Sequence, residues 1–306
     1  MQVSIVIPTK DRGKVFNETL ESVVRAIEGM DAEVIVVNDS KSSSPRIPNE
    51  FKNVRLVNNP KSGVASARNL GASLSQADIV LFMDDDFIIP ADSITQAIKI
   101  SQHDPKKIHL FNWIYPPSLQ ERLMQFQFGR YLEKHGFTSV KGWLADAWRD
   151  EEVFELKDGA SYFLPIQKTV FTEIGGYNEN FPHAGAEDYD FIQRAKKKGI
   201  RFYLDKRCVL FHNESDRIDL QTWLKRKERN GETLQMAVRL GYKELALNYP
   251  FYKRIMISIL SRGKSVLFSL LRLIPNVNWL DGLYFKITGW LLSVYLFDGY
   301  SKKILQ

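Results

Sequence analysis

Four short apolar runs separated by helical patterns most constrain the fold of this 306-residue chain. The runs are VSIVI (3–7), EVIVV (33–37), VRLVN (54–58) and IVLFM (79–83). They are rich in β-branched residues and almost continuously apolar, which is typical of strands buried on both faces of a parallel sheet. Residues 17–28 and 64–75 have helical periodicity and lie between them. This alternation predicts an α/β fold with a mostly parallel central sheet.

The chain continues with mixed elements after these strands. We expect helices over 119–136, 168–177 and 187–199, and strands over 108–115, 160–166, 201–205 and 208–212. Residues 137–156 mix aromatic and charged side chains without a clear period, and we expect a loop over a site there.

Acidic side chains follow three of the predicted strands. Asp11, Asp39 and the triplet 84–86 all come a few residues after a strand end, where open α/β sheets bind ligands. Three adjacent carboxylates repel one another, and carboxylates at i and i+2 of an extended segment point to one side, as a hard divalent cation requires. Such cations share their ligands with phosphates, which indicates a phosphorylated substrate. The alternative is a solvated acidic turn that caps a helix beginning near Ala91.

The charge of the chain is unevenly distributed. Residues 225–306 hold 14 basic and 5 acidic residues, a net charge of +9, whereas the remainder holds 28 basic and 31 acidic residues, a net charge of −3. A basic tail predicts an anionic partner, either nucleic acid or a membrane surface. Its content of Leu, Ile, Phe, Trp and Tyr favours the membrane, and no nucleic-acid partner is expected.

The tail has two amphipathic basic segments, 251–275 and 283–306. The longest uncharged stretch, ITGWLLSVYLF, has 11 residues, short of the roughly 20 that span a bilayer. Basic amphipathic helices with aromatic residues are typical of interfacial anchors, so we expect peripheral membrane contact. The alternative is a helical subdomain packed on the N-terminal part of the chain or on another subunit, and an oligomer is compatible with the sequence.

A single cysteine, Cys208, fits a reducing compartment. The N-terminal stretch MQVSIVIPTKDR has no basic region and no small-residue cleavage site, and its apolar run is only as long as a strand, so we expect no signal peptide. The predicted location is cytoplasmic, at the inner face of the plasma membrane if the tail binds lipid.

Four segments in order carry a family resemblance: SIVIPTKDR, VIVVNDSKSS, SGVASARNLGASLSQADIVLFMDDD and GGYNENFPHAGAEDYDFIQRAKKKG. With them the chain resembles the family 2 glycosyltransferases of the GT-A fold, and linked motifs are more specific than single ones. The resemblance implies a catalytic domain over 1–215, with a donor-binding part over about 1–103 and an acceptor-binding part over about 104–215. A basic helical region, 216–306, lies outside it.

The resemblance also implies a metal site for Mn²⁺ or Mg²⁺. In it Asp86 is a direct ligand, and Asp84 contacts the metal or the ribose of the donor. Asp85 belongs to the donor-binding set or points back into the protein. His212 ends a predicted strand and is a further ligand by the resemblance, although a lone histidine is often purely structural.

Other donor contacts follow from the same resemblance. Asp39 contacts the nucleotide base, and Arg68 contacts the pyrophosphate or the base. The remaining donor-binding candidates are Pro8, Thr9, Asp11, Arg226 and Arg229.

Glu187 and Asp188 match the family's catalytic pair. Asp188 is the expected base, which takes the proton of the acceptor hydroxyl, and Glu187 orients the acceptor or the base. Because both residues begin a predicted helix, favourable interaction with the helix dipole is the alternative explanation.

The expected function is therefore inverting, metal-dependent transfer of a sugar from a nucleoside diphosphate, UDP being favoured. The acceptor would be a hydroxyl of a glycan, a lipid-linked precursor or a cell-surface polymer of the envelope. The absence of a Q-x-x-R-W motif argues against a long-chain polymerase. One alternative is a nucleotide-sugar-binding module without turnover. A nucleotidyltransferase is less favoured, because PTKDRGKVFNE has one glycine where a triphosphate loop would need several.

Overall fold

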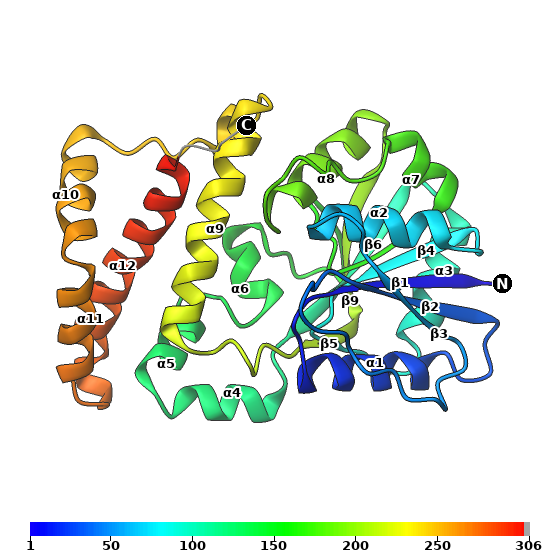
Figure 1. Cartoon of the computed structure of the whole chain (residues 1–306), viewed down its shortest axis with the longest axis horizontal. Helices are drawn as coiled ribbons and strands as arrows, with labels where there is room; N and C mark the ends of the chain where they lie inside the picture. The colour runs from blue at the N-terminus through cyan, green and yellow to red at the C-terminus, as the bar shows by residue number, and fades with distance from the viewer. Residues whose placement is uncertain (303–306) are drawn as a thin grey trace. The chain divides into compact units, whose positions relative to one another are not determined.

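The computed structural model describes residues 1–302, which form two compact units (Figure 1). The first unit comprises residues 1–116, 144–180 and 187–214. The second comprises residues 117–143, 181–186 and the described residues from 215 onward. The second unit therefore includes a segment that the sequence analysis groups with the acceptor-binding part.

A five-stranded sheet is the core of the first unit. Its strand order is β3-β2-β1-β4-β8. The strands are β1 (Val3–Thr9), β2 (Ala32–Asn38), β3 (Val54–Asn58), β4 (Ile79–Met83) and β8 (Phe163–Gln167). The first four are parallel and β8 is antiparallel to β4, which confirms the predicted mostly parallel sheet. Every residue of β1, β2 and β4 is buried, as the continuous apolar runs indicate.

Helices cover both faces of this sheet, with α1 and α2 on opposite sides (Figure 1). The helices of the first unit are α1 (Lys14–Ala26), α2 (Val64–Leu74), α3 (Ser93–His103), α7 (Lys168–Ile174) and α8 (Ala186–Lys197). In α2 a Cβ at Gly71 would overlap the side chain of Val6, so glycine allows this helix to pack closely on β1.

A second sheet has the order β5-β9-β6, with β7 also pairing with β9. Its strands are β5 (Phe87–Ile88), β6 (Lys107–Ile114), β7 (Val153–Leu156) and β9 (Arg201–His212). The expected loop over 137–156 is thus wrong in part, because it contains α6 (Val140–Leu144), the 3₁₀ helix η1 (Ala145–Ala147) and β7. The strand β7 forms because Val153 to Leu156 pair with the first part of β9, residues 202–205.

The prediction of two strands over 201–212 is also wrong, because β9 is continuous. The register against β6 shifts between Phe111, opposite Asp205, and Asn112, opposite Val209. The Asp205 carboxylate accepts hydrogen bonds from the backbone N–H of Arg207 at 3.1 Å and from its Nε at 2.9 Å. The polar residues between the two apolar runs are therefore held as a bulge within one strand.

The second unit is helical. It contains α4 (Pro117–Met124), α5 (Gln127–Lys134), α9 (Leu220–Arg239), η2 (Lys243–Leu245), α10 (Phe251–Arg262), α11 (Lys264–Leu273), η3 (Asn278–Leu280) and α12 (Asp281–Ser301). The single helix predicted over 119–136 is two helices. A Cβ at Gly129 would overlap the carbonyl oxygen of Leu123, so glycine lets α5 fold back closely on the end of α4.

Two glycines allow the long helices α9 and α12 to pack closely against each other. A Cβ at Gly231 would overlap the carbonyl oxygen of Leu296, and one at Gly299 would overlap that of Glu228. The backbones therefore approach more closely than larger residues would permit. Within residues 1–302 no helix is both long and apolar enough to cross a membrane.

Candidate active site

The three aspartates after β4 have different partners. The carboxylate of Asp84 accepts a hydrogen bond from Arg68 Nη2 at 2.8 Å. Asp85 Oδ2 accepts one from the Thr9 hydroxyl at 2.7 Å, and Asp86 Oδ2 accepts one from Arg12 Nη2 at 2.9 Å. The triplet thus divides into one carboxylate directed to α2 and two directed to the end of β1.

Arg12 is a buried cation that the sequence analysis did not single out. Its Nε lies 3.7 Å from Asp85 Oδ1, and its Nη2 binds Asp86. Burial raises the pKa of Asp85 to about 7 despite the guanidinium. Burial also acts to raise the pKa of Asp86, but the charges of His212 and Arg12 outweigh it, so this pKa lies below its usual range. Asp86 is therefore held ionised.

Asp86, His212 and Glu214 form the cluster best suited to a metal. One ligand atom of each lies within 4.8 Å of the others. His212 ends β9, opposite Phe87 of β5, and its ring stacks on the Phe87 ring at a centroid distance of 4.6 Å. Two carboxylates and one imidazole are a donor set that suits Mn²⁺.

Glu214 is the residue that sequence reasoning missed. It lies two positions after His212, and the i, i+2 rule for extended segments was the available signal. The Tyr115 hydroxyl donates a hydrogen bond of 2.5 Å to Glu214 Oε2, which orients the carboxylate. Asp84, predicted as a metal contact, is absent from this cluster because its side chain is directed to Arg68.

Arg68 joins three carboxylates from distant parts of the chain. Its Nη1 donates to Glu187 Oε1 at 3.1 Å and to Asp188 Oδ1 at 2.9 Å, in addition to the bond from Nη2 to Asp84. Its guanidinium also lies over the Tyr177 ring, 5.1 Å from the centroid. Burial raises the pKa of Asp84 to about 6, although Arg68 opposes this rise. The side chain predicted to contact the donor therefore pairs with acidic groups of the protein.

Glu187 and Asp188 begin α8 but differ in accessibility. Glu187 is 1% exposed, whereas the Asp188 side chain is 22% exposed. Asp188 Oδ2 also accepts a hydrogen bond from the backbone N–H of Ser161 at 3.2 Å. Of the two carboxylates, Asp188 is the one that can contact a bound molecule.

The predicted nucleotide-binding residues lie at the carboxyl ends of β1 and β2. Pro8 and Thr9 end β1, and the Thr9 carbonyl accepts a hydrogen bond of 2.8 Å from the Asp39 N–H. Asp39 Oδ1 accepts hydrogen bonds from Asn59 Nδ2 at 2.7 Å and from the Gly63 N–H at 2.9 Å.

Asp11 has a positive φ of 53° and accepts hydrogen bonds from the Ser40 and Ser43 hydroxyls at 2.6 and 2.7 Å, which lower its pKa. Arg226 and Arg229 lie on α9, in the second unit, and their donor contacts stay predictions.

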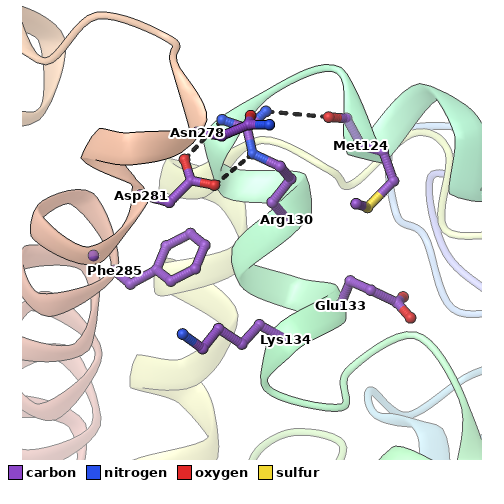
Figure 2. A pocket seen from close by; sticks show the side chains of 8 residues that line it. Met124, Arg130, Glu133, Lys134, Asn278, Asp281 and Phe285 are labelled. Carbon is purple, nitrogen blue, oxygen red and sulfur yellow. Dashed lines mark hydrogen bonds and ion pairs between the residues drawn. The ribbon is translucent and has the colours of Figure 1, made fainter.

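A pocket of about 440 Å³ lies within the second unit, between the start of α12 and the helices α4 and α5 (Figure 2). Arg130 borders it and forms hydrogen bonds of 2.7 Å to both carboxylate oxygens of Asp281. Its Nη1 also donates to the carbonyl of Met124 at 3.1 Å. The guanidinium of Arg130 thus holds α5 to α12. None of the active-site residues described above borders this pocket.

Comparison with known proteins shows similarity to glycosyltransferases. Residues 4–147 match "Glycosyl transferase family 2", and residues 160–209 match "N-terminal domain of galactosyltransferase". Nearly half of the chain is thus similar to glycosyltransferase family 2. The first match covers Asp39, Arg68 and the triplet, and the second covers Glu187 and Asp188.

Two curated relatives of this chain are informative. An uncharacterized glycosyltransferase of Haemophilus influenzae is 27% identical over 194 residues, which are 62% of this chain and 60% of the relative. A glucosyl-dolichyl phosphate glucuronosyltransferase of Haloferax volcanii is 25% identical over 195 residues, 60% of this chain and 58% of the relative. The chain thus spans about three fifths of the length of these relatives.

A solved structure confirms the predicted GT-A fold. A mannosyltransferase from Pyrobaculum calidifontis, in complex with GDP-Man and Mn²⁺, superimposes with a TM-score of 0.56 at 14% identity. The match covers 99% of this chain and 88% of the other. At this identity the likeness concerns the fold.

Proposed function

We propose that this protein transfers a glycosyl group from a nucleoside diphosphate sugar to an acceptor hydroxyl, with inversion. One observation carries the proposal. The triplet after β4 connects the possible metal cluster, through Asp86, with the accessible carboxylate of Asp188, through Asp84 and Arg68. A site for a diphosphate leaving group and a candidate base are therefore adjacent to the same strand end.

In this proposal Asp86, His212 and Glu214 hold a divalent metal. A bound metal would neutralise the negative charge that develops on the leaving diphosphate. Arg12 acts on this site indirectly, because its guanidinium orients the Asp86 carboxylate and helps to keep it ionised. The Mn²⁺ named in the structure of the mannosyltransferase supports the choice of ion.

Asp188 would act as the base. The acceptor oxygen forms a bond to the anomeric carbon while the bond from that carbon to the diphosphate oxygen breaks, and the hydroxyl proton passes to Asp188. A direct displacement inverts the anomeric centre. Glu187 is buried against Arg68 and would orient Asp188 through the shared guanidinium.

We favour a UDP-sugar as donor on the family resemblance, with Asp39 at the base. GDP-sugars are the next candidates, since GDP-Man is bound in the structure of the mannosyltransferase. A lipid-linked acceptor is supported by the dolichyl phosphate in the name of the Haloferax volcanii relative. Envelope polysaccharide synthesis and a location at the cytoplasmic face of a membrane stay predictions from the sequence.

The proposal is tested by nucleoside diphosphate release from a panel of UDP-, GDP- and dTDP-sugars with Mn²⁺ and with EDTA. Release from one donor should require metal and fall at least 100-fold in Asp188→Asn, since general bases contribute about 10²–10⁴-fold. Glu173→Gln changes an exposed carboxylate of α7 and should retain full activity. Nucleotide binding without release, for every donor and acceptor offered, would instead identify a binding module.

A further inference from the structure

Large exposed apolar side chains are concentrated in one part of the second unit. Among the described residues fifteen such side chains are exposed, and eleven of them lie within residues 251–283. Leu273 is 77% exposed and Trp279 is 81% exposed. Such a local concentration of exposed large apolar side chains indicates an interaction site rather than ordinary protein surface.

Both α10 and α11 carry apolar residues on two sides. In α10, Ile257 is buried, while Tyr252, Ile255 and Ile259 recur at intervals of three and four on the other side and are exposed. Both helices contact α12, which Figure 1 shows between them and α9. One side of each helix therefore belongs to the helical core, and the other needs a different apolar partner.

In α11, Leu267 and Leu271 are buried. Val266, Leu270 and Leu273 form a second, exposed stripe. This helix therefore repeats the pattern of α10.

The charge of this surface is of one sign. Between residues 245 and 280 the chain has five basic residues, Lys253, Arg254, Arg262, Lys264 and Arg272, and no acidic residue. Arg254, Arg262 and Arg272 are exposed. The cores of protein–protein interfaces are depleted of charge, whereas interfacial membrane helices combine Lys and Arg with Trp, Phe and Leu. Charge complementarity thus favours an anionic lipid surface over a protein partner.

We propose that the exposed apolar and basic side chains of residues 251–283, here called the α10–α11 surface, dock on a bilayer that contains anionic lipids. The apolar side chains would enter the boundary between headgroups and acyl chains, and the arginines would contact lipid phosphates. This surface would place the chain on the membrane without crossing it. Its consequence, access to a lipid-linked acceptor, rests on the proposed function.

Sedimentation of the full chain with vesicles tests the docking. The vesicles contain phosphatidylglycerol and phosphatidylcholine, or phosphatidylcholine alone. The protein should bind the anionic vesicles, more weakly at high salt, and bind neutral vesicles far less. Each basic residue contributes about fivefold to such binding. The triple variant Arg254→Glu, Arg262→Glu, Arg272→Glu should therefore lose on the order of 100-fold.

Two further variants separate this surface from general effects. Ile259→Ser, Leu273→Ser, Trp279→Ser removes exposed apolar groups and should reduce vesicle binding at least tenfold. Lys52→Glu, Lys106→Glu, Lys197→Glu makes the same charge change at exposed lysines of the first unit and should bind as the parent protein does. Circular dichroism and nucleotide binding should be unchanged in all three variants.

Three results would overturn the docking proposal. In the first, the parent protein fails to bind anionic vesicles. In the second, both surface variants bind vesicles as the parent protein does. In the third, light scattering shows a dimer that does not bind vesicles and that dissociates in the apolar variant. The last result would make the surface a subunit interface. Vesicle binding without sugar transfer would refute the proposed function alone, so the two proposals fail separately.

Discussion

Arg68 alone pairs with three carboxylates of the candidate site. Three carboxylates from β4 and α8 share one buried guanidinium, so the net charge of the group is negative even when Arg68 is paired. A buried ion pair adds little stability over apolar residues, but removal of one partner leaves buried charges without compensation. Arg68 is therefore required for the carboxylates to stay ionised together.

We expect Arg68→Met to lose about 3–5 kcal/mol of unfolding free energy at pH 7.5 without metal. Arg68 lowers the pKa of Asp84, which burial raises to about 6, so in this variant that folded-state pKa rises further and the folded protein binds more protons. The stability of the variant then falls as pH rises from about 4 towards the raised pKa, and its loss relative to the parent protein should be smaller at pH 5. Urea unfolding at both pH values measures it. The exposed Arg25→Met is the control, and a loss independent of pH would contradict the argument.

Glu214 provides a test of the metal cluster. Glu214→Gln keeps the shape of the side chain and its contact with Tyr115 but removes the anionic ligand. Since hard divalent cations prefer carboxylate oxygens, we expect the Kd for Mn²⁺ to rise at least tenfold. Titration followed by electron paramagnetic resonance of free Mn²⁺ measures it. Equal affinity in Glu214→Gln and in the control Glu173→Gln would remove Glu214 from the site.

Asp205 at the β9 bulge gives a stability difference that depends on pH. Burial acts to raise its pKa, but the contacts with Arg207 and His109 outweigh this, so the folded-state pKa lies well below its usual range. Its contribution is present above the unfolded pKa of about 3.9 and is lost as pH falls below that value.

Asp205→Asn should therefore be about 2 kcal/mol less stable than the parent at pH 7. The two proteins should converge in acid. Urea unfolding between pH 3 and pH 7 checks this, with the exposed Asp78→Asn as control. A constant difference across this pH range would exclude Asp205 as the cause.

At the scale of elements, the parallel strands were predictable because β-branched runs buried on both faces have few other structures available. The bulge in β9 and the break between α4 and α5 were not. Each depends on a contact with a residue outside the periodic pattern, the Arg207–Asp205 pair in one case and the approach of Gly129 to Leu123 in the other. Periodicity reports which face is buried, and it does not report where two backbones touch.

The packing of α9 against α12 can be tested within one helix. Gly299→Ala places a methyl group against the carbonyl of Glu228, a backbone atom that cannot easily move. We expect a loss of about 1–3 kcal/mol, as for overpacked cores. Gly289→Ala in the same helix meets no atom within 4 Å and should gain about 0.5–1 kcal/mol from helix propensity. Thermal unfolding distinguishes the two, and equal effects would refute the close approach.

At the scale of the whole molecule, the site assembles from segments far apart in sequence. The triplet at 84–86, the start of α8 and the end of β9 meet only after the sheets form. Strand-end placement predicted the position of the triplet, whereas Glu187, Asp188 and His212 were implied by the family resemblance. Neither could predict that Arg68 would face carboxylates instead of solvent, since side-chain pairing depends on packing in three dimensions.

This assembly predicts a linked response to ligand. Addition of Mn²⁺ with the nucleoside diphosphate of the accepted donor should slow amide exchange about tenfold or more at 84–88, 186–190 and 211–214 together, since ligands stabilise the state that they bind. Exchange measured by mass spectrometry with and without EDTA checks it. Protection confined to 84–88 would show that these segments do not act as one site.

The hydrogen bonds between Arg130 and Asp281 also have a consequence for folding during synthesis on the ribosome. The two residues are 151 positions apart, so α5 leaves the ribosome long before its partner is synthesised. At roughly 5–20 residues per second this interval is on the order of 10–30 s. During that time Tyr131 of α5 lacks its contact with Phe285 of α12, and a nascent chain that stalls before residue 281 should be a preferred client of chaperones.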